Sequence, residues 1–115
     1  MLNHVMIGSD DIEQSKKFYN AVLAVLGAGE PMENVNNTGH TRLFYVHGGS
    51  TFSVSEPIND EPVTNSNGFT LGLACESPEQ VKELHDVAIA MEVPVWKILL
   101  DAEKGQWVLC TFVIF

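Results

Sequence analysis

The sequence predicts an α+β fold in which one small strand-and-helix unit occurs twice. Two strand-like segments, residues 2–8 and 69–75, are each followed by a capped segment with helical periodicity. More strand-like segments follow the first helix, and a polar linker separates the two halves. We therefore predict a single domain over residues 1–115, with unit one at 1–57, a linker at 58–67 and unit two at 68–115.

The first unit begins with a predicted strand and helix. Alternation in residues 2–8 places His4 and Met6 on one face of the strand. Ser9, Asp10 and Asp11 all offer helix N-caps, and Glu13, three residues after Asp10, suggests a loose capping box. Apolar residues then recur at helical spacing up to Leu26, and Gly27 and Gly29 end the helix.

The remainder of the first unit reads as strands and turns. Residues 31–39 are polar and predict a loop, or a ragged strand and turn. Residues 41–47 predict a strand, residues 48–50 a turn, and residues 51–55 a second strand. Alternation divides this last strand into two faces: Phe52 and Val54 on one, and Thr51, Ser53 and Ser55 on the other.

The second unit repeats the strand and the helix after a linker. Pro57 to Gly68 is rich in Pro, Asn, Asp, Ser and Gly, which favour turns and loops. Residues 69–75 form the predicted strand. Ser77 is the predicted N-cap, with Pro78 at the first helical position and Gln80 closing a capping box. The apolar stripe of this helix is Val81, Leu84, Ala88 and Met91.

Charge and composition exclude several classes of function. The formal net charge of -9 disfavours nucleic acid and anionic membrane surfaces as partners. Two cysteines, Cys75 and Cys110, are too few for a disulfide-built scaffold, and we expect both to be reduced thiols. The sequence contains neither a signal-peptide pattern nor an apolar run long enough to span a membrane. We therefore expect a cytoplasmic protein.

Three segments together resemble the vicinal-oxygen-chelate superfamily of glyoxalases, bleomycin resistance proteins and extradiol dioxygenases. They are residues 2–27 (LNHVMIGSDDIEQSKKFYNAVLAVLG), 43–57 (LFYVHGGSTFSVSEP) and 67–90 (NGFTLGLACESPEQVKELHDVAIA). The resemblance covers about residues 1–90. It implies paired βαβββ-type units whose strands curl into a cup-shaped site, with the second unit altered at its C-terminal strands.

The resemblance also implies a metal site, but most of the matching positions in this chain lack a good metal ligand. Relatives hold a divalent metal with His, Glu or Gln side chains and use it as a Lewis acid. His4 matches the ligand on the first strand. The next two expected ligands fall on Ser53 and Thr70, and the final Glu has no clear counterpart. We therefore expect a polar, hydrogen-bonding pocket with no cofactor, and keep a divalent metal bound by His4 as the alternative.

The predicted ligand pocket consists of His4, Arg42, Phe44, Ser53 and Thr70. The resemblance places His4, Ser53 and Thr70 on the inner strand faces, and Arg42 and Phe44 lie together on the strand at 41–47. Arg42 either holds an anionic substrate or pairs with a surface acid of this acidic chain. Glu56, at the end of a strand, is a general base only if burial raises its pKa, and a solvated strand end is the simpler interpretation. No catalytic residue is assigned.

Three functions remain open at this stage. The first is a small-molecule binder with a polar cup and no complete metal site, which we favour. The second is a metal-dependent enzyme similar to lactoylglutathione lyase or to the dioxygenases. The third is a degenerate, non-catalytic member of the family. Because one fold hosts several chemistries, the resemblance alone does not choose between them.

The segment after Ala90 departs from the family pattern. Residues 91–115 contain both tryptophans and lack the family's closing turn. Read one base earlier, permitted codons for this segment can encode text typical of the family, which suggests an ancestral frameshift. Residues 107–115 are strong strand formers that are apolar on both faces, so they require burial. We therefore expect a homodimer, with strand exchange between the chains as one form of it.

Overall fold

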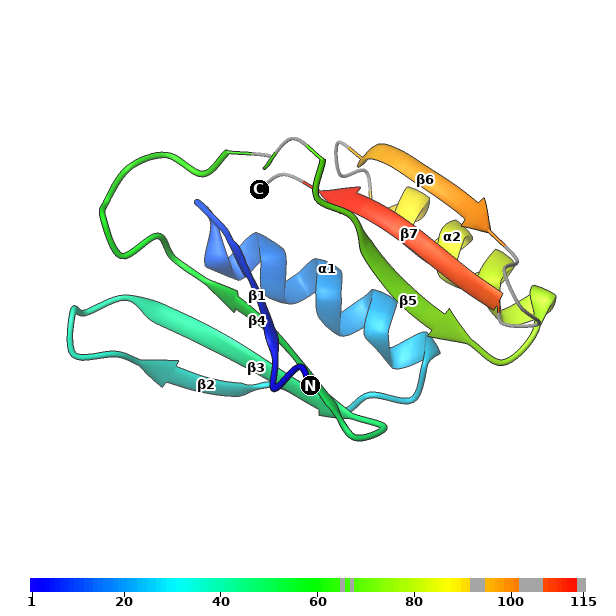
Figure 1. The fold of residues 1–115 in the computed structure, drawn as a ribbon, viewed down its shortest axis with the longest axis horizontal. Coiled ribbons are helices and arrows are strands. Elements are labelled where there is room, and N and C mark those ends of the chain that lie inside the picture. The colour runs from blue at the N-terminus through cyan, green and yellow to red at the C-terminus, as the bar shows by residue number, and fades with distance from the viewer. Residues whose placement is uncertain (65, 67, 92–94, 102–106, 114–115) are drawn as a thin grey trace. The chain divides into compact units, whose positions relative to one another are not determined.

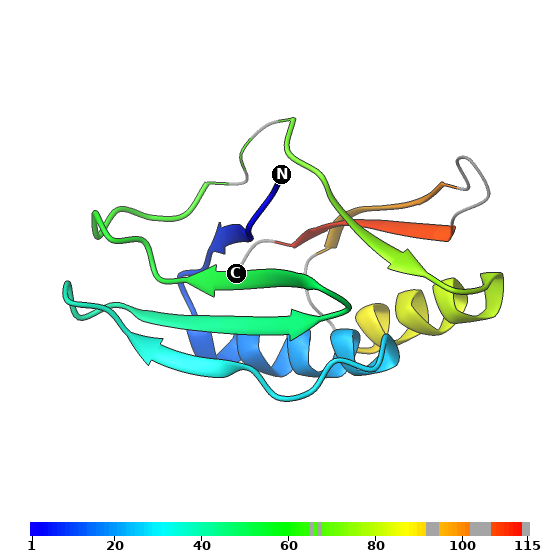
Figure 2. The ribbon, with the colours of Figure 1, turned by 60° about the horizontal axis from the view of Figure 1, so that its bottom comes forward.

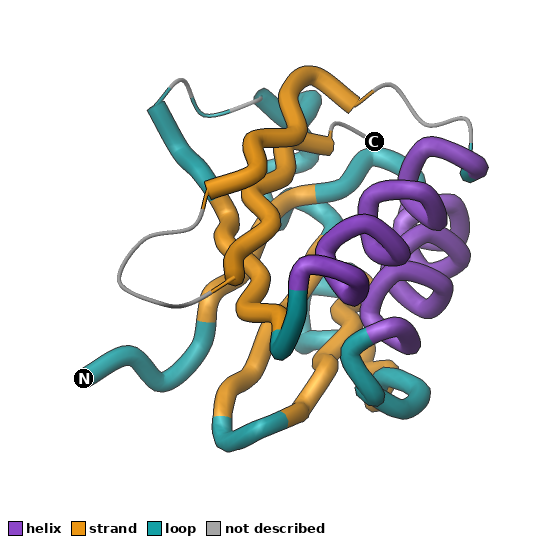
Figure 3. The backbone as a smooth tube through the Cα atoms, turned by 90° about the vertical axis from the view of Figure 1, so that its right-hand side faces the viewer, coloured by secondary structure: helices purple, strands orange, loops and turns teal. Residues whose placement is uncertain are grey.

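The computed structural model of the chain describes residues 1–64, 66, 68–91, 95–101 and 107–113. It divides into two compact units, Met1–Thr64 and Asn65–Ile114. The boundary lies inside the segment 58–67 that the sequence predicts as a linker. Each unit has its own sheet and its own helix (Figures 1 and 3).

The first unit is a βαβββ unit with a mixed four-stranded sheet. Its elements are β1 (Val5–Gly8), α1 (Ile12–Val25), β2 (Met32–Val35), β3 (Thr41–His47) and β4 (Ser50–Ser55). The strand order is β1-β4-β3-β2. β1 is parallel to β4, whereas the other two pairs are antiparallel. The parallel pair is joined by a connection that contains α1, as parallel strands require.

The expected curling of these strands into a cup is not observed in this sheet. β1 and β2 have one strand neighbour each among the described residues, so the sheet is open at both edges. Figure 2 shows the strands as a layer with α1 along one side of it. Four strands are too few to close on themselves, because even small closed barrels use more. Within the first unit, α1 therefore covers one face of the sheet and no helix covers the other.

Helix α1 forms the core of the first unit together with the sheet. Phe18, Tyr19, Val22 and Leu23 of α1 are buried, as are Leu43, Tyr45 and Val54 of the strands. The Tyr19 ring lies 4.9 Å from the Phe52 ring and 5.0 Å from the Phe18 ring, between centroids. The predicted apolar stripe of the helix is thus confirmed as the face that packs on β3 and β4.

The structure corrects the predicted start of this helix. Asp11 is the N-cap, and its side chain accepts a hydrogen bond from the Gln14 backbone N–H at 3.1 Å. The loose capping box of Asp10 and Glu13 is therefore wrong by one residue. Asp10 instead binds the linker, because its carboxylate accepts a hydrogen bond from the backbone N–H of Val63 at 3.1 Å. The predicted end is confirmed: Gly27 follows the helix with φ +93°.

Turns set the register of the other strands. Gly48 and Gly49 have φ values of 57° and 80°, which glycine adopts at low cost, and they join β3 to β4 in a tight hairpin. The sequence predicts either a loop or a strand and a turn for the polar segment 31–39, and the structure has the strand and the turn. β2 occupies its first part, and Asn36 closes the turn by accepting the His40 backbone N–H at 3.0 Å.

The second unit contains β5 (Leu71–Cys75), α2 (Pro78–Ala90), β6 (Val95–Asp101) and β7 (Trp107–Val113). Its sheet has the order β5-β7-β6, and both pairs are antiparallel. Ser77 caps α2 as predicted, accepting the Gln80 N–H at 3.1 Å. Val81, Leu84 and Ala88 are the buried side chains of that helix.

The second unit reproduces part of the predicted repeat of the first. The described residues of the second unit give strand, helix, strand, strand, so a second complete βαβββ unit stays a prediction. Residues 92–94, 102–106 and 114–115 lie outside the described residues. The strand predicted in 107–115 is found as β7, the central strand of its sheet. Among the described residues, neither helix is long and apolar enough to cross a membrane.

Candidate functional site

The candidate site is the face of the first sheet that is turned away from α1, which we call the polar face. Strand alternation puts Leu43 and Tyr45 against the helix, so their neighbours Arg42 and Phe44 point to the opposite face. The register extends this face across the four strands. Phe44 pairs with Ser53 and Met32, Arg42 with Ser55 and Asn34, and Ser53 with Met6. The polar face thus comprises Met6, Gly8, Met32, Asn34, Arg42, Phe44, Ser53 and Ser55.

Ser53 lies at the floor of the polar face. Its neighbours across the two strand pairs are Met6 and Phe44, whose side chains are much larger. Ser53 is 0% exposed, and its hydroxyl has no hydrogen-bond partner among the described residues. A buried hydroxyl without a partner costs folding free energy, because it has lost its hydrogen bonds to water. Such an atom is typical of a position that a ligand or a water completes.

Arg42 lies on the same face and is held in place from two sides. Its Nη2 donates a hydrogen bond to Asn34 Oδ1 at 2.8 Å. Its guanidinium carbon lies 5.5 Å from the centroid of the Phe44 ring, within the range of a cation–π contact. The Nε atom is buried and has no partner among the described residues. The arginine is therefore positioned, but its donors are not all used.

The carboxylates near Arg42 in the sequence are engaged elsewhere. Glu33 accepts a hydrogen bond from Lys16 Nζ at 3.2 Å, which raises the pKa of Lys16 above its ordinary value. Glu56 accepts the Thr41 backbone N–H at 2.7 Å, and Asp60 lies 2.7 Å from His40 Nε2. Arg42 forms no ion pair with any described residue. Its hydrogen-bond partner is the neutral side chain of Asn34, so the predicted pairing of Arg42 with a surface acid is not observed.

The other two predicted pocket residues are placed less closely. His4 immediately precedes β1, two residues before Met6, and its side chain is exposed. Its Nδ1 lies 2.7 Å from Asn3 Oδ1. Thr70 belongs to the second unit, where it is exposed directly before β5. Within the first unit, the structure thus brings together Arg42, Phe44 and Ser53 of the predicted set.

The donor set at the expected metal positions does not fit a transition metal. The expected ligand positions offer one imidazole, on His4, and the hydroxyls of Ser53 and Thr70, which are weak ligands for Zn, Ni or Fe when neutral. Among the described residues, no three His, Cys, Asp or Glu side chains gather in a way that could hold a metal ion. These residues suit hydrogen bonding to an organic ligand better than metal coordination.

The structure adds a feature that the sequence did not indicate: the linker is attached to the first unit. Val63 lies over Gly8, where an added Cβ would come within 3.2 Å of its side chain. The Val63 N–H is held by Asp10, and the side chain of His40, only 13% exposed, is bonded to Asp60. His40 is therefore held by the linker. No local pattern could have revealed contacts between such distant residues.

Glu56 also has a structural task. Besides its carboxylate bond to the Thr41 N–H, its own N–H donates to the Thr41 carbonyl oxygen at 3.1 Å. Both bonds join the end of β4 to the start of β3. This agrees with the interpretation of Glu56 as a strand end rather than a general base.

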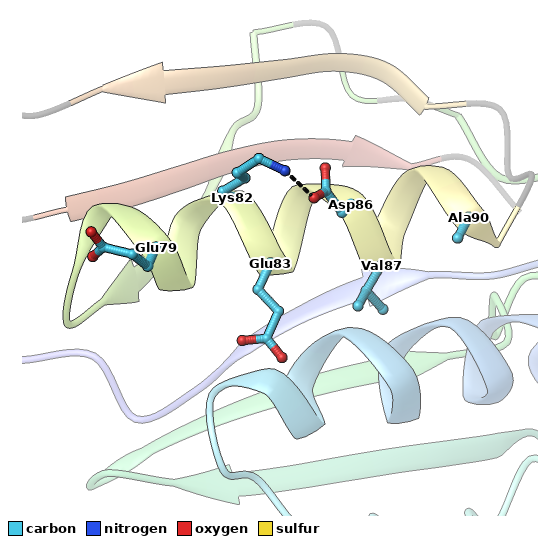
Figure 4. Close-up of a pocket in the computed structure, with 6 residues that line it drawn as sticks. All are labelled: Glu79, Lys82, Glu83, Asp86, Val87 and Ala90. Atoms are coloured by element: carbon cyan, nitrogen blue, oxygen red, sulfur yellow. Dashed lines mark hydrogen bonds and ion pairs between the residues drawn. The ribbon is translucent and has the colours of Figure 1, made fainter.

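A shallow hollow lies along one side of α2 (Figure 4). It has a volume of about 460 Å³ and is lined by Glu79, Lys82, Glu83, Asp86, Val87 and Ala90. Lys82 Nζ bonds to Asp86 at 2.6 Å, which lowers the pKa of that carboxyl. All six residues come from one helix, and the charged side chains stand in solvent. No buried polar group converges on this hollow among the described residues, so it is a weaker candidate than the polar face.

The comparison with family models decides the classification. The model described as the Glyoxalase/Bleomycin resistance protein/Dioxygenase superfamily matches residues 1–108. The chain belongs to this superfamily. The match extends beyond residue 90, where the three recognisable segments end, and includes part of the atypical C-terminal segment.

Solved structures give the same classification. A glyoxalase/bleomycin resistance protein from Albidiferax ferrireducens T118 is 37% identical, with a TM-score of 0.75, and the alignment covers 95% of this chain and 86% of that one. No curated protein matches the chain.

Two more distant structures show the fold alone. A fosfomycin resistance protein from Listeria monocytogenes, crystallised with Mn(II) and 1S,2S-dihydroxypropylphosphonic acid, is 16% identical with a TM-score of 0.60, and 86% of this chain and 75% of that one are covered. A glyoxalase family protein from Enterococcus faecalis is 19% identical with a TM-score of 0.58, and 98% and 89% are covered.

Proposed function

We propose that this superfamily member binds a small molecule on the polar face of its first unit, without a complete metal site. The observation that carries the proposal is the pair of buried, unpartnered polar atoms, Ser53 Oγ and Arg42 Nε, on one face of one sheet. Proteins rarely bury polar atoms without partners, and exceptions concentrate at sites that await one.

The residues divide the work of binding in a simple way. Phe44, Met6 and Met32 offer apolar surface, and Met6 and Met32 are 40% and 65% exposed. Arg42 and Ser53 offer hydrogen-bond donors that fix the orientation of a ligand. A mostly apolar surface with a few placed polar groups is the usual composition of small-molecule sites. His4, which directly precedes β1, is proposed to border the same site, and the role of Thr70 stays a prediction from the sequence.

Ligand screening by protein NMR tests this proposal. The ¹⁵N-labelled chain is titrated with a library of small organic molecules that contains acids, bases and neutral compounds. We expect the compounds that bind to shift the backbone amides of Arg42, Phe44 and Ser53, and not those of Glu79 to Ala90. A library without binders, or binders that shift only the α2 amides, would contradict the proposal.

The metal-free part of the proposal has its own measurement. The protein, purified without chelator and then soaked in Zn²⁺, Ni²⁺, Mn²⁺ or Fe²⁺, is analysed by elemental mass spectrometry beside a His4→Ala variant. We expect far less than one metal ion per chain in both proteins. Near one ion per chain that disappears in the variant would support the metal-dependent enzyme instead.

A further inference from the structure

We infer that the ligand of the polar face is a small organic oxyanion, such as a carboxylate or a phosphonate, bound by Arg42 and Ser53 with its apolar part on Phe44. This inference rests on the proposed function and specifies the chemical class of the ligand. Its basis is that Arg42 and Ser53 both keep unused hydrogen-bond donors on the same sheet face.

The charge of Arg42 is the first argument. It is the chain's single arginine, in a sequence with 15 acidic and 6 basic residues. With such an excess of carboxylates, an exposed arginine would easily find an acidic partner. Instead, Glu33, Glu56 and Asp60 are bound to other groups, and Arg42 has no ion pair among the described residues. The positive charge on the polar face is therefore left uncompensated.

The geometry of the guanidinium is the second argument. Asn34 takes one Nη2 donor, and the Phe44 ring supports the group at 5.5 Å. These contacts fix the plane of the guanidinium while leaving the Nε–H unpaired. An arginine edge with two parallel N–H donors matches the two oxygens of a carboxylate or phosphonate, and a charge-assisted pair of this kind is stronger than a neutral one. A neutral ligand would use this edge less well.

Ser53 supplies the third argument. Its hydroxyl lies beside Phe44 in the strand register, diagonally across from Arg42. A hydroxyl can donate to the same anion that an arginine binds. No described residue of the protein partners the hydroxyl, so a structural hydrogen bond within the fold does not account for it. The residue is better explained as one that gains its partner when the anion arrives.

The test measures binding of three matched aromatic probes: benzoate, phenylphosphonate and neutral benzamide. NMR titration at low ionic strength follows the amides of Phe44 and Ser53. We expect both anions to bind at least tenfold more tightly than benzamide, and to lose affinity as salt is added. Arg42→Gln should weaken the anions about tenfold and leave benzamide nearly unchanged. Lys82→Gln, which removes one positive charge from α2, is the control and should change nothing.

Ser53→Ala separates a binding role from a structural one. We expect this variant to weaken anion binding several-fold while its melting temperature stays equal or rises, because a buried unpartnered hydroxyl is removed. A lower melting temperature with unchanged anion binding would overturn the role of Ser53.

The outcomes also distinguish the two proposals. If benzamide binds as tightly as benzoate and Arg42→Gln has no effect, the inference that the ligand is an anion is wrong. A small-molecule site on the polar face would still stand. If none of the three probes shifts the polar-face amides and the wider library also fails, the site itself is wrong.

Discussion

Two adjacent aspartates at the start of α1 have separate tasks, although the sequence treats them as equivalent caps. Asp11 accepts the Gln14 N–H and caps the N-terminus of the helix, whereas Asp10 accepts the Val63 N–H from the linker. Both side chains are short, acidic and followed by a helical pattern, so either residue satisfies the rule for an N-cap. The choice is made by the linker, which lies far away in the sequence.

The two tasks predict different effects of mutation. We expect Asp11→Ala to lower the free energy of unfolding by about 1 kcal/mol, because the cap of α1 is lost. Asp10→Ala should cost less, but it should accelerate hydrogen exchange at the Val63 amide, which loses its acceptor. Urea unfolding and hydrogen exchange measured by NMR provide the two readouts.

Asp11→Asn serves as the control, since asparagine is an equally good cap and should restore most of the stability. Equal losses of stability in Asp10→Ala and Asp11→Ala, with unchanged exchange at Val63, would contradict this division of tasks.

The candidate site was partly predictable at the residue scale. Alternation in residues 51–55 already places Ser53 opposite Phe52 and Val54. Alternation along one strand does not show which residues of the adjacent strands lie beside it. That Ser53 lacks a partner, and that Arg42 faces Asn34 rather than an acid, depends on the pairing of β2, β3 and β4. Register of this kind is set by turns and tertiary packing, so the unpartnered atoms emerge from the structure alone.

At the scale of the elements, patterned segments were predicted well and unpatterned ones were not. Helices α1 and α2 have apolar stripes and caps, and β3 and β4 have alternating residues around a Gly-Gly turn. β2 has all four residues exposed, so no periodicity distinguishes it from a loop. It becomes a strand because β3 offers it a ladder of backbone hydrogen bonds.

The packing of α1 on the sheet also predicts an effect of alkaline pH. Tyr19 is 2% exposed among Phe18 and Phe52, and burial raises the pKa of its phenol well above the ordinary value of about 10. Above about pH 10 the unfolded chain releases this proton while the folded chain keeps it. The folded state then binds more protons, so its stability is full below pH 10 and falls as the pH rises further.

We therefore expect the free energy of unfolding to decrease between pH 9 and pH 11, and to decrease less in Tyr19→Phe. Urea titrations across this range measure both slopes. Tyr45 retains its own raised pKa from burial and provides the residual slope of the variant. Identical slopes in the two proteins would show that Tyr19 ionises freely in the folded state.

At the scale of the whole molecule, the family could be recognised from the sequence, but the second unit could not be derived. The repeat of strand and capped helix is visible in residues 2–27 and 67–90, and the family model confirms the membership. The segment after Ala90 has strong strand formers without a pattern that fixes their order. The antiparallel order β5-β7-β6 is therefore a finding. The frameshift stays a prediction, and the downstream bases of the gene are what tests it.

The remaining prediction concerns assembly. The sequence leads us to expect a homodimer, because residues 107–115 are apolar on both faces. In sedimentation equilibrium, we expect about twice the chain mass of 12.7 kDa at micromolar concentrations. A mass that stays at 12.7 kDa over a hundredfold range of concentration would show a monomer, and the site would then have to function within one chain.

The form of the dimer follows from the position of β7. This strand is paired on both edges within its own chain, with β5 and β6, so exchanging it would break two ladders at once. We therefore expect side-by-side association in preference to strand exchange. Native mass spectrometry of mixed ¹⁵N-labelled and unlabelled protein distinguishes the two forms. Side-by-side dimers form mixed pairs without unfolding, whereas exchanged dimers mix only as fast as the second unit unfolds. Mixing that requires heat or denaturant would favour exchange, and would mean that β7 completes its sheet in the partner.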